Sequence, residues 1–361
     1  MANMIGITGF KFVVAATMAL SVSTFSIFPG ISAAEDSRYQ PTPAGQQIRQ
    51  NCRSQSPQPV AFIANPSYIH GNAILWQPPE DIECLDLFYG VGGPEGAPDP
   101  SSPFTYVGRS KSGTQKKIIV EDVYGRKWTV KFGPEARPET TATRLVWAAG
   151  YHVDQDYFVP YARIVGKENI VARNVRFERR DDGYKDVGNW EWKDNPFLGS
   201  PEFERLKVLM ALLKNWDLKT RNNEILVRKK EQGPQIYYVS DLGSTFGATG
   251  NLWNKIPLFD DLPPAISISC GKTKGNPRGY VGDGFIEEVR GGRVYFRGGR
   301  TRFRKIFSGV SVTNARWMGN LLGRLSNEQL YDAFHAGGFN AAETGVYVSI
   351  LRARITTLQR L

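Results

Sequence analysis

The sequence predicts an α+β fold, because strand-like segments come first along the chain and helix-like segments follow them. Three short segments between residues 104 and 132 are rich in β-branched and aromatic residues, and the third alternates polar and apolar side chains, as half-buried strands do. After residue 203, apolar residues recur every three to four positions, which is typical of helices with one buried face. A chain of 361 residues with 41% hydrophobic side chains is long enough for two lobes and a sizeable core.

The expected elements follow from these patterns and from the residues that interrupt them. A turn at residues 124–126 joins the second and third strands, so that three strands form an antiparallel meander. Pro138 suits a first helical turn, and Gly150 ends the helix that follows the meander. Strands are expected at 104–109, 117–122, 127–132, within 164–177, at 224–229 and at 235–240; helices are expected at 140–149, 203–215, 314–325, 327–337 and 341–358.

The first 34 residues have the order of a secretory signal peptide. A weakly charged leader ends at Lys11, an uncharged apolar stretch runs from Phe12 to Phe28, and small residues at 32–34 suit a signal-peptidase cut before Glu35. The alternative is a retained membrane anchor, but an apolar stretch of 17 residues is at the short limit for crossing a bilayer. We therefore expect an exported protein, periplasmic or secreted, with no stable membrane span after cleavage.

Cysteine content and charge narrow the classes of function. Cys52, Cys84 and Cys270 could form one disulfide in an oxidising compartment and leave one thiol, and their spacing gives no zinc-ligand pair. The formal net charge of +10 favours partners that carry phosphate or acidic groups. The three histidines are scattered, so a hydrolase of the Ser-His-Asp type is not supported.

A set of polar residues follows the helix expected at 203–215. Asp217 and Lys219 lie just after it, Asn222 comes five residues after Asp217, and a predicted hairpin then leads to Asp241 in an Asp-Leu-Gly sequence. A carboxylate can accept or orient an attacking hydroxyl group, and an ammonium group can neutralise a transferred phosphoryl group. Amide and carboxylate oxygens are ligands that hard divalent metals prefer. Each motif is short enough to arise by chance, so the order of helix, loop, hairpin and Asp-Leu-Gly carries the weight.

This order resembles the protein-kinase superfamily, in which a hairpin separates a catalytic loop from an Asp-Phe-Gly motif. The resemblance implies that Asp217 and Lys219 are catalytic, that Asn222 and Asp241 bind Mg²⁺ or Mn²⁺, and that ATP is the phosphate donor. Asn223 could replace Asn222 as the metal ligand, since the two asparagines are adjacent. The resemblance also implies a two-lobed α+β fold with an antiparallel-sheet N-lobe and a mainly helical C-lobe.

The same resemblance assigns residues in the strand-rich half. A kinase holds the ATP phosphates with a lysine on its third strand, and Lys131 lies there, on the opposite face from Trp128 and Val130. A helix glutamate must hold that lysine; Glu139 is the only glutamate that the next helix offers, and Glu135 is the fallback. The alternatives are a solvated strand lysine and a carboxylate that merely stabilises a helix N-terminus.

The loop that covers the phosphates should connect the first two strands. Ser112, Gly113 and Thr114 lie there, so we expect their backbone N–H groups to contact the nucleotide. A glycine cluster at 90–93 looks more like a phosphate motif, but it lies far upstream of Lys131 with a Pro-rich loop between.

Several departures indicate an atypical member of this superfamily. Asn215 and Trp216 replace the usual His-Arg pair before the catalytic aspartate, and no Ala-Pro-Glu sequence follows residue 243. Because the missing arginine normally meets a phosphorylated activation loop, that mode of activation is not expected. The chain looks more like HipA-like bacterial kinases, phosphatidylinositol kinases or secretory-pathway kinases.

The first hypothesis is an exported atypical kinase that transfers the γ-phosphate of ATP to a hydroxyl group of a protein, lipid or small molecule, with an acidic or phosphorylated substrate suiting the basic surface. Its parts would be a signal peptide at 1–34, an N-terminal extension at 35–103, an N-lobe at 104–186 and a C-lobe at 187–361. The second is a catalytically silent, pseudokinase-like binding protein, because ATP is scarce outside the cytoplasm.

A third hypothesis is a nucleic-acid- or carbohydrate-binding protein. The segment 290–305 is rich in arginine and glycine, as some RNA-binding segments are. The same segment could be a solvated hairpin with Gly-Gly turns and a strand at 294–296. Export argues against RNA, so nucleic acid is not the expected partner.

Overall fold

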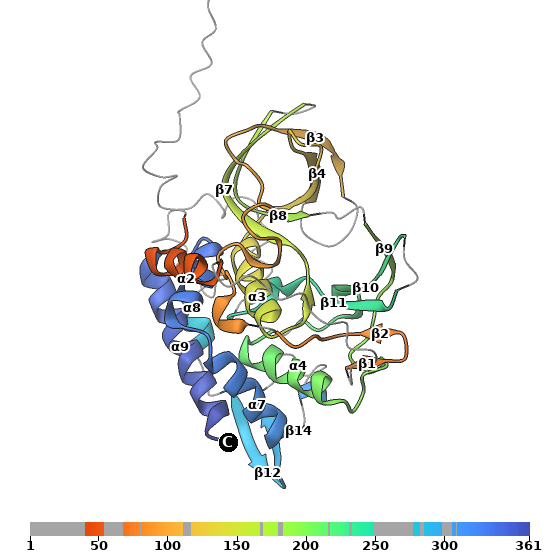
Figure 1. Ribbon diagram of the computed structural model, residues 1–361, viewed down its shortest axis with the longest axis vertical. Coiled ribbons are helices and arrows are strands. Elements are labelled where there is room, and N and C mark those ends of the chain that lie inside the picture. The colour runs from red at the N-terminus through yellow and green to blue at the C-terminus, as the bar shows by residue number, and fades with distance from the viewer. Residues whose placement is uncertain are drawn as a thin grey trace, which may run out of the picture. The chain divides into compact units, whose positions relative to one another are not determined.

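Helices and β-sheets are combined in the described part of the chain, as the sequence predicts (Figure 1). The computed structural model describes residues 40–53, 68–79, 81–110, 117–166, 169–179, 183–215, 217–230, 233–247, 277–281, 285–297, 305–307 and 309–361, all within the unit Tyr39–Leu361. The predicted signal peptide, the loop residues Ser112, Gly113 and Thr114, and Cys270 lie outside the described residues.

Five strands form a closed barrel. Three of them are the predicted antiparallel meander, namely β3 (Phe104–Arg109), β4 (Lys117–Glu121) and β5 (Lys127–Lys131). The hairpin of β7 (Asp156–Val165) and β8 (Ile170–Arg179) completes the barrel, with β8 beside β5 and β7 parallel to β3. The strand character expected within 164–177 therefore belongs to two strands, which pair along most of their length.

Side-chain alternation along β5 fills the barrel and leaves one charged group on its outside. Trp128 and Val130 are fully buried in the barrel core with Phe104 and Phe177. Lys131 points to the opposite face, as the period of two predicts, yet it is only 1% exposed. Helix α3 (Ala136–Ala148) covers this face by packing on β7 and β8.

A second sheet lies around the predicted hairpin of β10 (Asn223–Arg228) and β11 (Gln235–Val239). Its other strands are β1 (Ile69–His70), β2 (Ala73–Ile74), β6 (His152–Val153) and β9 (Tyr184–Gly188). Both β2 and β6 run parallel to β11, and β9 pairs with β10. The hairpin is therefore fixed on both sides, which positions the loops at its two ends.

The helix-rich part follows the predicted pattern closely. Ser200 caps α4 (Pro201–Leu212) by accepting a hydrogen bond from the Phe203 N–H group. Helix α4 packs against α7 (Val312–Gly323), which lies beside α9 (Ala341–Gln359), and α8 (Asn327–Ala336) packs on α9 (Figure 1). Trp190 and Trp192 are 3% and 4% exposed, so both pack in the core beside α4.

The described part of the basic segment is a hairpin. β12 (Ile286–Arg290) and β13 (Arg293–Phe296) turn at Gly291 and Gly292, whose φ angles are both positive, and β14 (Val310–Ser311) pairs with β13. The predicted Gly-Gly turn and the strand at 294–296 are therefore confirmed for these residues, with Val294 and Phe296 buried in the core and Arg290 and Arg293 exposed. A short helix, α6 (Pro277–Val281), is the one described element between residues 247 and 285.

Residues 40–53, within the predicted N-terminal extension, contain a helix. Cys52 in α2 (Pro43–Arg53) forms a disulfide with Cys84 at the end of the 3-10 turn η1 (Ile82–Cys84). The Thr42 N–H group donates to Asp332 on α8 at 2.9 Å. Its apolar residues Ala44, Ile48 and Cys52 recur every four positions, which was the available signal for a helix within a polar segment.

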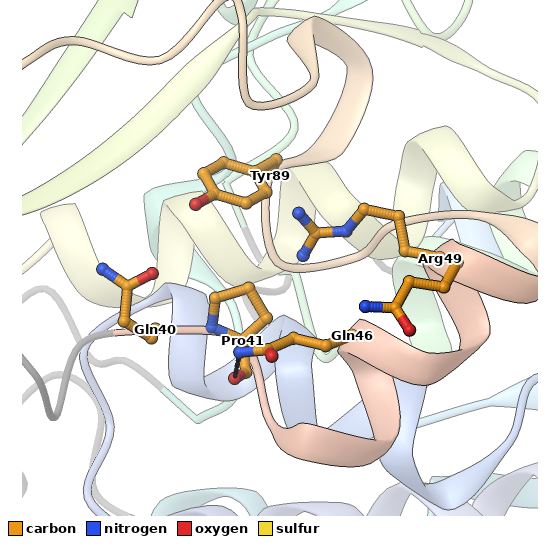
Figure 2. A pocket seen from close by; sticks show the side chains of 6 residues that line it. Gln40, Pro41, Gln46, Arg49 and Tyr89 are labelled. Carbon is orange, nitrogen blue, oxygen red and sulfur yellow. Dashed lines mark hydrogen bonds between the residues drawn. The ribbon is translucent and has the colours of Figure 1, made fainter. Parts of the chain in front are cut away.

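A small hollow lies between α2 and the loop that carries Tyr89. Its lining residues are Gln40, Pro41, Gln46, Arg49, Gln50 and Tyr89, and the Arg49 guanidinium faces the Tyr89 ring at 5.0 Å (Figure 2). None of the predicted site residues lines it. In the portion of the chain that is described, every helix is too short or too polar to cross a bilayer.

Candidate active site

Lys131 is the centre of a buried cluster of charges. Its side chain is 2% exposed, and its Nζ atom lies near three carboxylate oxygens: 2.7 Å from Asp241 Oδ1, 2.9 Å from Glu139 Oε2 and 3.0 Å from Glu135 Oε2. Asp241 is 110 residues away along the chain, so the fold and not local sequence creates this contact. The solvated-lysine alternative is therefore wrong for Lys131.

The charges in this cluster shift one another's pKa values. Burial acts to lower the pKa of Lys131, but the carboxylates of Glu139 and Asp241 outweigh it and raise the pKa, so Lys131 is charged at neutral pH. Burial acts to raise the pKa of Asp241, but the Lys131 ammonium outweighs it and lowers the pKa to about 2. Both groups are therefore ionised over the physiological range.

Helix α3 brings both candidate glutamates to Lys131. Glu139 lies in its first turn and is completely buried, and Glu135 is the residue at its N-terminal boundary. The second oxygen of Glu139, Oε1, accepts a hydrogen bond from Arg176 Nη1 at 2.5 Å. The fallback residue and the preferred residue thus both contact Lys131, and Glu139 bridges Lys131 and Arg176.

The Asp-Leu-Gly segment is pressed against the start of α3. Asp241 adopts left-handed backbone angles (φ 49°, ψ 52°), and Leu242 is fully buried in the core. A Cβ atom on Gly243 would lie only 2.8 Å from the Cβ atom of Glu135, so this position requires glycine. Thr245 Oγ1 donates to the carbonyl of Pro138 at 3.3 Å, which ties the segment to α3.

The loop after α4 is held by its own polar side chains. The Asp217 N–H group donates to Asn215 Oδ1 at 3.1 Å, and Lys219 Nζ donates to Asp217 Oδ2 at 2.5 Å. Asn222 Nδ2 donates to the Asp217 carbonyl at 2.7 Å, which closes the loop. Asn215 therefore has a local role in orienting this loop.

The adjacent asparagines make different contacts. Asn223 uses its amide nitrogen to bond the carbonyls of Trp190 and Lys219, at 3.2 and 3.4 Å. The Asn222 carbonyl accepts from the Ser240 N–H group at 3.0 Å, so Asn222 pairs with the residue that precedes Asp241. Asn222 thus contacts both the Asp217 loop and the residue before Asp241, whereas the described bonds of Asn223 run to Trp190 and Lys219.

A metal at this place would need donors from outside the protein. Among the residues that the structure describes, no group of three His, Cys, Asp or Glu side chains is arranged to hold a metal ion. One carboxylate and one amide oxygen, from Asp241 and Asn222, suit a hard cation that completes its shell with phosphate oxygens and water. The donor set fits Mg²⁺ or Mn²⁺.

The network around Lys131 carries more negative than positive charge. Among the described residues, its ion pairs join two cations, Lys131 and Arg176, with five carboxylates: Glu135, Glu139, Asp156, Glu178 and Asp241. The excess of three formal negative charges would repel a nucleotide on its own. A divalent cation would offset most of this repulsion.

Comparisons with known proteins identify no family. No family model matches the sequence, and no curated protein matches it. The structure is similar to the crystal structure of the Helicobacter pylori proinflammatory kinase CtkA, with a TM-score of 0.39 and 12% sequence identity, over 71% of this chain and 95% of that one. A likeness this loose cannot assign any residue, so the site depends on its own geometry.

Three members of the cluster were missed from the sequence. Arg176 and Glu178 lie on β8, and Asp156 begins β7; all three are buried. The prediction treated parts of β7 and β8 as one strand within 164–177. It therefore did not place Arg176 on β8, opposite Lys131 on β5. Alternation of Arg176, Phe177 and Glu178 was the available signal, since Phe177 faces the barrel core and the charged residues face α3.

Proposed function

We propose that this protein is an exported, two-lobed, protein-kinase-like phosphotransferase that uses ATP and Mg²⁺ or Mn²⁺. The observation that carries the proposal is the contact of Lys131 with Glu139 and Asp241, which come from a strand, a helix and a distant Asp-Leu-Gly segment. A strand lysine held by a helix glutamate, beside a metal-binding aspartate, is the arrangement that kinases require for phosphoryl transfer.

Each residue has a role in this proposal. Lys131, oriented by Glu139, would hold the α- and β-phosphates, and residues 112–114 would cover them. Asp241 and Asn222 would hold the metal, which neutralises charge on the phosphates. Asp217 would orient the acceptor hydroxyl group, and Lys219 would stabilise charge on the transferred phosphoryl group.

Phosphoryl transfer needs Lys219 to leave its present partner. In the structure, Lys219 Nζ donates to Asp217 Oδ2 at 2.5 Å, so the two candidate catalytic groups neutralise each other. A bound γ-phosphate would offer the ammonium a more highly charged partner and free the Asp217 oxygen for the acceptor. This exchange couples nucleotide binding to activation of the acceptor.

Nucleotide binding is the first test. The melting temperature should rise with ATP and Mg²⁺ together and should not rise with ATP alone, because the site carries excess negative charge. Asp241→Asn should abolish the metal-dependent rise, whereas Asp194→Asn, an exposed control, should keep it. If millimolar ATP with Mg²⁺ leaves the melting temperature unchanged, the proposed function is wrong.

Transfer is tested separately from binding. Incubation with γ-labelled ATP should label the protein itself or release phosphate, and Asp217→Asn should remove this activity while preserving the metal-dependent rise in melting temperature. Binding without any turnover in the native protein would instead support a silent, pseudokinase-like protein.

Export has an independent observation in its favour. Cys52 and Cys84 form a disulfide, and such bonds persist in oxidising compartments such as the periplasm or the extracellular medium. The test is the amino-terminal sequence of the mature protein, recovered from the periplasmic or secreted fraction. Export predicts a new terminus at Glu35; recovery of the intact chain from the cytoplasm would refute it.

A further inference from the structure

Arg176 is a second buried cation beside the candidate active-site pair. It lies on β8 directly across from Lys131 on β5, and the two side chains are both 2% exposed. Glu139 is shared between them: Oε2 accepts from Lys131 at 2.9 Å, and Oε1 accepts from Arg176 at 2.5 Å. The helix carboxylate is therefore bound by two strands at once.

Arg176 is itself held in place by the barrel. Its Nη1 atom lies 3.1 Å from Asp156 Oδ2, and its Nη2 atom pairs with Glu178. The planar guanidinium can hold several carboxylates in fixed directions, which a single ammonium group cannot do. Because Asp156 and Glu178 belong to paired strands, Arg176 forms a rigid anchor that does not depend on Lys131.

A second arginine attaches the same helix to β7, the strand that pairs with β8. Arg144, on α3, is 2% exposed and donates from Nη2 to the carbonyl of Asp156 at 2.6 Å. Glu139 and Arg144 are five residues apart, so these contacts fix α3 near both its N-terminal end and its middle. Helix α3 is thus attached to the barrel by two arginine contacts that do not involve Lys131.

We propose that Arg176 is a positioning residue, which anchors Glu139 so that α3 stays docked while Lys131 exchanges partners during the phosphotransferase reaction. This inference rests on the proposed function. Nucleotide binding must draw Lys131 from Asp241 toward phosphate, and Asp241 toward the metal. With Arg176 present, Glu139 keeps a cation throughout this exchange, and the helix keeps its place.

A permanent anchor has a regulatory consequence. In protein kinases, control of activity acts through the position of the helix that supplies the glutamate. Arg176 fixes this position within the resting chain, so no phosphorylation is needed to assemble the Lys131–Glu139 pair. The replacement of the usual His-Arg pair by Asn215 and Trp216 agrees with this, since that arginine would have no phosphorylated loop to bind.

The test must separate positioning from stability. Arg176→Met alone leaves Asp156 and Glu178 buried without their cation and can fail to fold. The double variant Arg176→Met/Asp156→Asn keeps the net charge of the native protein, and Asp156→Asn alone is the matched control that retains the Arg176–Glu139 contact. Arg176→Lys tests rescue by a cation without the guanidinium fork.

Two readouts are needed: the dissociation constant for a fluorescent ATP analogue with Mg²⁺, and amide hydrogen exchange of residues 136–148. We expect the double variant to bind the analogue about ten- to hundredfold more weakly than Asp156→Asn, as for other residues that orient a ligand-holding side chain. Exchange in α3 should be faster, and Arg176→Lys should restore binding only in part.

The outcomes distinguish this proposal from the function on which it rests. If the double variant folds, binds the analogue as Asp156→Asn does and exchanges α3 amides at the same rate, Arg176 does not position Glu139. If the native protein does not bind the analogue at all, the proposed function is wrong. The exchange measurement then decides alone whether Arg176 anchors α3, with unchanged exchange overturning the anchor.

Discussion

Replacement of Lys131 by methionine tests the buried cluster most directly. Methionine has a similar length but no charge, so Glu135, Glu139 and Asp241 lose a shared cation. Removing one member of a buried ion pair typically costs about 3–5 kcal/mol of folding stability. For Lys131→Met we expect the lower value, about 3 kcal/mol. Arg176 still pairs with Glu139 at 2.5 Å in this variant, and the Asp241 side chain is 43% exposed to water.

Part of this cost depends on pH. The pKa of Asp241 is about 2 in the folded protein, below its ordinary value of 3.8, so its ionised form stabilises the fold above pH 3.8. This contribution is lost as pH falls through 2. It amounts to about 1 kcal/mol once the exposure of Asp241 to solvent is taken into account. Lys131→Met abolishes it, so the native protein and the variant should differ most at neutral pH.

Urea unfolding and thermal melting at pH 7 and pH 3 measure the effect. We expect Lys131→Met to lose about 3 kcal/mol at pH 7, with a melting temperature lower by about 6 °C. At pH 3 the difference should be smaller, and Lys131→Arg should lose less than Lys131→Met at both pH values. A variant as stable as the native protein at pH 7, or a difference that grows on acidification, would refute the buried cluster.

Three further predictions concern the rest of the fold. Replacing Cys52 and Cys84 by serine should cost about 3–4 kcal/mol in urea unfolding, because the disulfide closes a loop across 32 positions; equal stability with and without reductant would show that the bond is absent. Burial raises the pKa of Asp332 to about 6, so its favourable contribution to stability is present below pH 3.8 and is lost as pH rises through 6. Asp332→Asn should therefore increase the free energy of unfolding at pH 8 by up to about 3 kcal/mol and leave it unchanged at pH 4. Thermal melting at the two pH values measures this difference. Gly90→Ala should cost about 1–3 kcal/mol in thermal melting, since its φ is 71° and the new Cβ would meet Arg144 at 2.5 Å; Gly71→Ala, with a similar φ and no neighbour within 4 Å, should cost less, and equal losses would contradict the clash.

Much of the fold could be predicted, because local patterns determine it. Alternation along 127–131 and the three-to-four spacing in α4 identified elements whose ends agree with the structure within a few residues. The order of motifs led to Lys131, Glu139 and Asp241, and the structure brings these three side chains together. Order along the chain was informative here, because each residue type had to follow a particular element.

The remainder required knowledge of pairing between distant segments. The parallel pairing of β7 with β3, which closes the barrel, cannot be predicted from local sequence, since the pattern of either strand also suits the edge of an open sheet. Arg176 was missed for a related reason: a charged residue in a strand usually faces water, and only the covering helix makes it buried. Helix α2 was missed because only three apolar residues, Ala44, Ile48 and Cys52, mark its period within a polar segment. In the structure, a disulfide and the Thr42–Asp332 contact hold it.

The attachment of Thr42 to Asp332 joins residues 290 positions apart. If the chain is exported as proposed, it crosses the membrane amino end first, so Thr42 and α2 would reach the far side long before α8. In contrast, Cys84, the disulfide partner of Cys52 in α2, follows only 32 residues later. On the proposed export route, oxidation would thus fix helix α2 early, and the contact of Thr42 with α8 would form later.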